Sequence, residues 1–230
     1  MHHKLKALKE AFPHTIPVMT GYLFVGIAFG ILLSSKGYHF GWAILMSVFI
    51  YAGSMQFVAV NLLTMAFNPL NAFIITLMVN ARHLFYGITM LKHFNGQRGK
   101  KPYLIAGLTD ETYSILCSTE PPAGVDKGWF MFFVTLLNQL YWVVASAIGC
   151  LLGSLFTFNT KGIDFVMTAL FIVIFINQWR SHKEHFPAVI GVGISVLCLV
   201  LFGSDNFIIP SMALIMLALT IFRQSIERRA

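Results

Sequence analysis

Residues 70–91 read LNAFIITLMVNARHLFYGITML, an apolar stretch of 22 residues with Arg82 and His83 close to its centre. A helix of about 20 apolar residues is long enough to cross a bilayer. A cation near the bilayer midplane costs from about 2.5 to more than 10 kcal/mol, depending on the method, and such residues face a partner, a cavity or a substrate. Residues 70–91 therefore predict a membrane-spanning helix that presents polar chemistry to the interior of the protein.

The composition of the whole chain predicts an all-α integral membrane protein. Its 230 residues are 57% hydrophobic and 11% charged, with a mean hydropathy of +0.74. Soluble domains carry about 25% charged residues. We expect a single transmembrane domain over residues 1–230, because no stretch is polar enough for a separate soluble domain. There is room for about seven hydrophobic helical segments.

The apolar segments are separated by short polar or charged loops. The loop Glu120–Lys127, with its two prolines and a glycine, is the clearest break and suggests two related halves over residues 13–119 and 128–222. The segment 103–119 is short and acidic, so it either crosses the membrane or lies at its surface with both acids solvated. The segments are residues 15–34, 41–67, 70–91, 103–119, 128–156, 162–179, 186–202 and 207–222.

The chain has a net charge of +7, and its cations cluster at the ends of apolar segments. Orientation in the membrane explains this clustering better than a nucleic-acid partner does. The positive-inside rule places the basic tracts, and with them both termini, in the cytoplasm. Acidic or neutral loops are then expected on the outside. The basic tracts are Lys4–Lys9, Lys92–Lys101, Arg180–Lys183 and Arg223–Arg229, and the other loops are Glu120–Asp126 and Gly203–Asn206.

This assignment of sides conflicts with a simple series of single crossings. The segments 15–34, 41–67 and 70–91 would be three crossings and would leave Lys92–Lys101 outside. The conflict disappears if 41–67 breaks at Gly53-Ser54 into two half-helices that enter and leave on one side. The segment 128–156 would then have to break likewise, as paired broken helices do in many transporters. The alternative is long tilted helices and one basic loop that ignores the charge rule.

Four polar side chains share the helix predicted for residues 70–91. Asn80 and His83 lie three residues apart, and Arg82 and Tyr86 lie four apart, so each pair shares a helix face. The planar fork of arginine binds a carboxylate through two hydrogen bonds. The sequence therefore predicts a carboxylate site at Arg82, with a purely structural ion pair as the alternative.

Asp110 and Glu111 are the acids that could serve such a pair. Adjacent residues point about 100° apart on a helix, so one acid can pair with Arg82 while the other faces a pathway. Burial and a neighbouring carboxylate both favour the protonated acid, which makes this pair a candidate proton carrier. His83 is the second candidate, because imidazole titrates near neutral pH.

Three further residues, Gly53, Ser54 and Gln56, lie at the predicted break. An unwound turn there would expose backbone groups and helix ends to the ammonium or carboxylate of a substrate. The alternative interpretation is a packing face of small residues. The same alternatives hold for Asn138 with Tyr141 and Trp142, where hydrogen bonds between helices explain the pattern as well as substrate contact does.

Glycines spaced four apart indicate close helix packing at Gly26-x-x-x-Gly30 and Gly149-x-x-x-Gly153. No phosphate loop, zinc-ligand pattern or serine-nucleophile motif occurs, and the three cysteines stand alone in apolar segments. We therefore expect no cofactor, no metal, no enzymatic activity and no ATP-driven pump. Any energy source would be an ion gradient or the gradient of the substrate itself.

At these residues the chain resembles a known family, the AzlC-type branched-chain amino-acid export permeases. The second and third of the shared motifs are the most specific, and the second half of the chain matches by hydropathy alone. The shared motifs are Pro17-x-x-x-Gly21 with Gly26 and Gly30, Tyr51-Ala-Gly-Ser-x-Gln-Phe57, Asn80-x-Arg82-His83-x-x-Tyr86 and Asp110-Glu111-x-Tyr113.

The resemblance implies a multi-pass transporter of the bacterial inner membrane. It would export leucine, isoleucine and valine, with methionine as a further candidate, in exchange for protons. It also implies a small AzlD-type membrane subunit as partner, in addition to the amino acid, protons and the lipid bilayer. The alternative function is a passive channel for a small polar solute or ion, which would lack saturable transport that responds to a pH gradient.

Overall fold

The computed structural model describes residues 2–222 except 65–67, 98, 157–163 and 182–184. The chain forms two compact units, residues 1–167 and 168–230, and each is considered by itself. The basic tract 223–229 and half of the tract 180–183, both expected in the cytoplasm, lie outside the described residues. All candidate site residues lie in the first unit.

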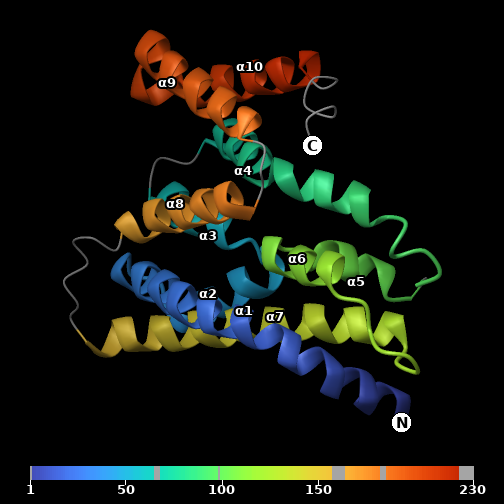
Figure 1. Cartoon of the computed structure of the whole chain (residues 1–230). Helices are drawn as coiled ribbons and strands as arrows, with labels where there is room; N and C mark the ends of the chain where they lie inside the picture. The colour runs from blue at the N-terminus through green and yellow to red at the C-terminus, as the bar shows by residue number, and fades with distance from the viewer. Residues whose placement is uncertain (1, 65–67, 98, 157–163, 182–184, 223–230) are drawn as a thin grey trace. The chain divides into compact units, whose positions relative to one another are not determined.

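The described residues form ten α-helices and no β-strand, which confirms the all-α prediction (Figure 1). Four of these helices, α1, α4, α7 and α9, are long and apolar enough to cross a membrane. The expected count of about seven apolar segments therefore stays a prediction. The helices are α1 His2–Ser35, α2 Phe40–Phe49, α3 Gly53–Thr64, α4 Pro69–Met90, α5 Lys101–Ala106, α6 Asp110–Ser118, α7 Lys127–Leu155, α8 Asp164–Ser181, α9 Phe186–Asn206 and α10 Ile208–Ile221.

The first unit is built around α1 and α7, which run side by side in the same direction (Figure 1). A Cβ on Gly30 would collide with the backbone of Ser146 and Cys150, and one on Gly149 would collide with the backbone of Ile27. The two glycine pairs predicted from the sequence thus meet each other across one interface. Without a hydrophobic force between helices in lipid, such close approach of backbones is what holds helices together.

A buried aromatic group fixes the broken helix α2–α3 against this pair. The ring of Phe29 on α1 lies 5.6 Å from that of Phe57 on α3 and 6.2 Å from that of Trp142 on α7. The indole of Trp142 also covers Gly53, where an added Cβ would lie 3.1 Å from the ring. The start of α3 is therefore held against the middle of α7.

The predicted break in the segment 41–67 is confirmed. Helix α2 ends at Phe49 and α3 begins at Gly53, so the link is Ile50–Ala52 and lies just before the predicted position. Tyr51 in this link has φ +41°, a left-handed conformation that costs a non-glycine residue about 1–3 kcal/mol and persists only where the surroundings hold it. The link is thus a fixed structural element.

The segment 103–119 is also broken. Helices α5 and α6 are joined by residues 107–109, and the Thr109 side chain caps α6 by accepting from the Thr112 backbone N–H. Helix α5 leads the chain away from the end of the first unit at which α7 begins. After α6 the chain is back at that end. Lys100 lies against Asp126 and Glu120 against Lys127, so the chain turns back at the α5–α6 link. The sequence left open whether these residues cross the membrane, and the number of crossings stays a prediction.

The structure decides two further points of topology. Helix α7 is continuous from Lys127 to Leu155, so the interpretation with a second break is wrong and the alternative of a long unbroken helix holds. The loop 120–126 was expected on the opposite side from the basic tracts, yet Lys100 Nζ lies 3.8 Å from Asp126 Oδ1. The ammonium groups of Lys4 and Lys100 both lie over the Trp129 ring, at 4.2 and 4.1 Å from its centroid. With the chain returned to this end by α5–α6, α7 can cross without breaking.

Candidate functional site

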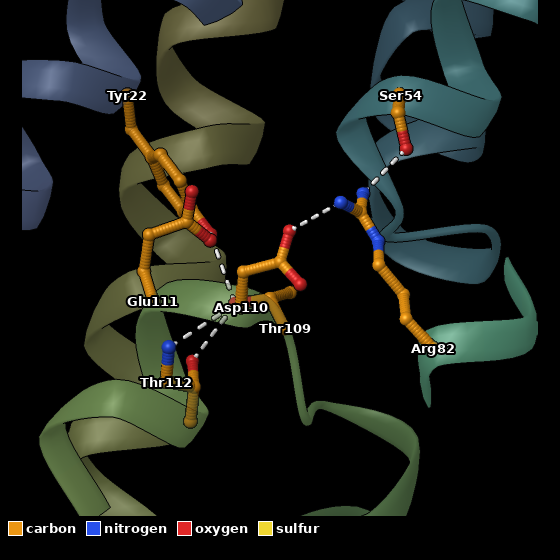
Figure 2. Close-up of polar contacts among 7 residues, drawn as sticks. All are labelled: Tyr22, Ser54, Arg82, Thr109, Asp110, Glu111 and Thr112. Atoms are coloured by element: carbon orange, nitrogen blue, oxygen red, sulfur yellow. Dashed lines mark hydrogen bonds and ion pairs between the residues drawn. The ribbon is translucent and has the colours of Figure 1, made fainter. Parts of the chain in front are cut away.

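Arg82 joins the starts of the two broken helices. Its Nη2 donates to Ser54 Oγ at 2.8 Å, and its Nη1 lies 3.0 Å from Asp110 Oδ2 (Figure 2). Ser54 is the second residue of α3 and Asp110 is the first residue of α6. The prediction that Arg82 pairs with one of the two acids is confirmed, with Asp110 as the partner.

The electrostatics of this junction favour an anion. The first N–H groups of a helix have no partner within the helix, and the helix dipole places partial positive charge there. The starts of α3 and α6 both contribute such groups beside the guanidinium of Arg82. The carboxylate of Asp110 balances this charge, and the side chains of Arg82 and Asp110 remain 28% and 25% exposed.

Several polar atoms around Arg82 have hydrogen-bonding capacity to spare. Buried polar atoms in proteins are normally paired. Among the described residues, three such atoms at the junction have no hydrogen-bond partner: Asn80 Oδ1, Arg82 Nε and Asp110 Oδ1. They comprise one donor, which suits a carboxylate, and two acceptors, which suit an ammonium group.

Glu111 belongs to a different group of contacts. Tyr22 on α1 donates to Glu111 Oε2 at 2.7 Å, and the Tyr22 hydroxyl lies 3.0 Å from Thr109 Oγ1 (Figure 2). Thr109 donates in turn to Thr112 Oγ1 at 3.1 Å, and Asn138 Nδ2 on α7 donates to the same oxygen at 3.0 Å. The predicted divergence of the two acids is confirmed, since Asp110 contacts Arg82 while Glu111 contacts Tyr22.

The side chain of Gln56 is held by residues of α2 and α7. Its Nε2 donates to Ser47 Oγ at 3.2 Å, and its Oε1 accepts from Trp142 Nε1 at 2.7 Å. Both ends of the amide are thus engaged, and the side chain is fully buried. Gln56 ties α2 and α3 to α7 and supports the junction from behind, so its predicted contact with a substrate does not match this geometry. Gly53 has the same supporting place against Trp142.

His83 and Tyr86 lie next to Arg82 on α4 but belong to an aromatic group. The His83 ring lies edge-on to that of Tyr86 at 6.0 Å, and Tyr86 stacks on Tyr113 of α6 at 4.4 Å. These rings join α4 to α6 one turn away from the Arg82–Asp110 pair. Within the described part of the chain, no group of three or more histidines, cysteines or acids could hold a metal ion.

The comparisons with known proteins identify the family. The family described as "AzlC protein" matches residues 17–156. The Bacillus subtilis protein named "Branched-chain amino acid transport protein AzlC" is 57% identical over 222 residues, which cover 96% of this chain and 87% of that protein. The chain belongs to the AzlC family.

More distant relatives differ in how much of the chain they cover. A membrane protein of Helicobacter pylori is 46% identical over 227 residues, which are 99% of this chain and all of that protein. The Escherichia coli "Inner membrane protein YgaZ" is 25% identical over 150 residues, which are 63% of this chain and 60% of that protein. None of the solved structures matches the chain.

The AzlC match spans every candidate site residue, including three that sequence reasoning missed: Tyr22, Thr109 and Thr112. Thr109 carried a usable signal, because threonine directly before two acids is typical of the residue that caps a helix start. Thr112 and Tyr22 carried none, since single hydroxyl-bearing residues in apolar segments are common. Only the fold brings Tyr22 to Glu111 and Asn138 to Thr112.

Proposed function

We propose that this AzlC-family chain exports branched-chain amino acids across the bacterial inner membrane. The name of the Bacillus subtilis relative, 57% identical over most of both chains, supports branched-chain amino acids as the substrate class. The four long apolar helices of the described residues support a place in the membrane. Outward direction and coupling to protons are part of the proposal, as are cytoplasmic termini.

The observation that carries the proposal is the position of Arg82 between Ser54 and Asp110. A guanidinium has five N–H donors, so a substrate carboxylate can first bind at Nε, beside the contacts to Ser54 and Asp110. The starts of α3 and α6 add partial positive charge. The unpartnered oxygens of Asp110 and Asn80 are then the acceptors for the substrate ammonium.

This arrangement also suggests how binding is linked to movement. Arg82 on α4 holds the starts of α3 and α6 together, so a carboxylate that competes with Asp110 for the guanidinium loosens the contact between them. Asp110 freed from Arg82 would pair with the substrate ammonium. One of the titratable groups, Asp110, Glu111 or His83, exchanges a proton in each cycle.

We further propose that the chain works with a small AzlD-type membrane subunit. Helix α4 is long and apolar, and only 6% of its most apolar window is buried within the chain. Lipid and a second polypeptide are both compatible with such a face. The partner is therefore tested together with the transport activity.

The test is efflux of preloaded radiolabelled leucine from cells that produce this chain alone or with a small AzlD-type membrane protein, with and without a proton gradient. We expect efflux that is accelerated, saturable and dependent on the gradient. The variant Arg82→Ala should abolish it while the protein remains in the membrane. Saturable efflux that responds to the gradient would exclude the passive channel.

Efflux by Arg82→Ala at the rate of the unmodified protein would contradict the assignment of the site. Unchanged leucine efflux with both proteins present in the membrane would remove branched-chain amino acids as the substrate. An effect that needs only this chain would remove the small subunit from the proposal and leave the transport activity in place.

A further inference from the structure

A line of hydroxyl groups connects Glu111 to the buried core of the first unit. It runs from Glu111 Oε2 to Tyr22, then to Thr109 and Thr112, over contacts of 2.7, 3.0 and 3.1 Å. Tyr22, Thr109 and Thr112 are 7%, 6% and 0% exposed, whereas Glu111 is only partly buried. The line therefore starts at a partly buried acid and ends at the fully buried Asn138 of α7.

The direction of the hydrogen bonds in this line depends on Glu111. Each hydroxyl carries one proton. Either oxygen can donate in the contact between Tyr22 and Thr109. With Glu111 ionised, Tyr22 donates to the carboxylate and can accept from Thr109. Thr112 then still accepts from Asn138, so the donors of Thr109 and Tyr22 both point toward the acid.

A proton on Glu111 reverses this direction. The carboxylic acid then donates to the Tyr22 oxygen, the phenol donates to Thr109, and Thr109 donates to Thr112, as the contact geometry allows. Every donor then points from the acid toward the buried end. Protonation of Glu111 thus changes which group donates at the contacts between α1, α6 and the α5–α6 link.

We propose that Glu111 is the group that carries the coupling proton, and that Tyr22 and Thr109 are positioning residues that convert its protonation into a change of contacts between helices. This inference rests on the proposed transport function and selects Glu111 over Asp110 and His83. Asp110 is already paired with Arg82 at 3.0 Å, and the ring of His83 lies against Tyr86.

The Tyr22 ring links this line to the broken helix α2–α3. It packs edge-on against Trp142 at 5.2 Å, and the Trp142 indole donates to Gln56 on α3. A shift of the Tyr22 hydroxyl toward or away from Glu111 therefore acts on the tryptophan that covers the start of α3. The substrate junction at Ser54 lies at that same helix start.

The titratable groups that face Glu111 come from each neighbouring element. They are Tyr22 on α1, Tyr51 in the α2–α3 link and Asp110 on α6 itself. The neighbouring residue from α7 in this line is the uncharged Asn138. Arg82 balances the charge of Asp110. Among the described residues, Glu111 forms no ion pair.

Infrared difference spectroscopy of the purified protein tests the protonation directly and does not depend on transport. Titration across the neutral range should change a carbonyl-stretch band of a protonated carboxylic acid. The band should be absent from Glu111→Gln and shifted in frequency in Tyr22→Phe, which removes the phenol contact and leaves the acid. The matched control is Glu120→Gln, the same change at a loop acid that is 89% exposed, and it should leave the band unchanged. An identical band in Glu111→Gln would overturn the proposal.

Transport in proteoliposomes tests the coupling. In Glu111→Gln, leucine movement driven by a pH gradient should fall by on the order of tenfold or more, while leucine–leucine exchange at equal pH persists, because exchange needs no net proton transfer. Gradient-driven movement equal to that of the unmodified protein would overturn the inference. If the unmodified protein moves no leucine, the proposed function fails, and the infrared result still decides the state of Glu111.

Discussion

At the scale of single residues, Arg82 has a structural and a functional role that can be separated. In Arg82→Ala the carboxylate of Asp110 loses its cation. Breaking a fully buried ion pair costs about 3–5 kcal/mol, and we expect less here because both side chains are about a quarter exposed. The double variant Arg82→Ala/Asp110→Ala should recover the thermal stability of the purified protein but not leucine transport. Full transport by the double variant would show that the pair is structural only.

Tyr51 offers a second test at the residue scale. Its hydroxyl is buried and, among the described residues, has no hydrogen-bond partner, which is a cost of about 1–3 kcal/mol to the folded protein. Tyr51→Phe keeps the ring and removes the hydroxyl, so the unfolding temperature should stay equal or rise. Leucine transport should fall several-fold, because this hydroxyl faces Glu111, the proposed proton carrier. Unchanged transport together with unchanged stability would remove Tyr51 from the site.

At the scale of helices, the α1–α7 interface depends on glycines. Gly149→Ala places a Cβ against the backbone of Ile27, and overpacking of this kind costs about 1–3 kcal/mol. The matched control is Gly21→Ala on α1, where an added Cβ meets nothing within 4 Å. It should be neutral or stabilising by up to about 1 kcal/mol, because alanine favours a helix. Thermal unfolding in detergent measures both, and equal effects of the two variants would contradict the interface.

The helices also show what the sequence could predict. The charge conflict and the Gly53-Ser54 pair predicted the α2–α3 break correctly. Both the charges of the loops and a Gly-Ser pair inside an apolar segment can be seen directly in the sequence. The same reasoning placed a second break in α7, where none exists. The return of the chain through α5–α6 could not be predicted, since a turn at Gly107 depends on packing against α7 and not on local composition.

The residues of the candidate site also differ in whether the sequence could predict their places. Arg82, Asp110 and Ser54 were predictable because charge and small polar residues are rare and costly in apolar segments. The places of Gln56, Tyr22 and Thr112 were not, because an amide or a hydroxyl in a helix has several possible partners. Their partners lie on other helices 26 to 89 residues away in the chain.

At the scale of the whole molecule, the described first unit predicts which loops share a side of the membrane. Lys100 contacts Asp126, and Lys4 and Lys100 flank Trp129. Single cysteines at positions 100 and 123, in a background without the native cysteines, should react with a membrane-impermeant thiol reagent from the same side. Position 36, at the other end of α1, should react from the opposite side. Labelling of 100 and 123 from opposite sides would contradict this topology.

The central claim is that this chain moves branched-chain amino acids through the junction at Arg82. Counterflow of labelled leucine in proteoliposomes tests it most directly, with the chain alone and with the small candidate subunit. The account predicts saturable counterflow that unlabelled isoleucine and valine inhibit, that lysine does not inhibit, and that is lost in Arg82→Lys, which keeps the charge and loses the fork. Leucine movement no faster than in protein-free liposomes, with the protein shown to be folded and inserted, would contradict it.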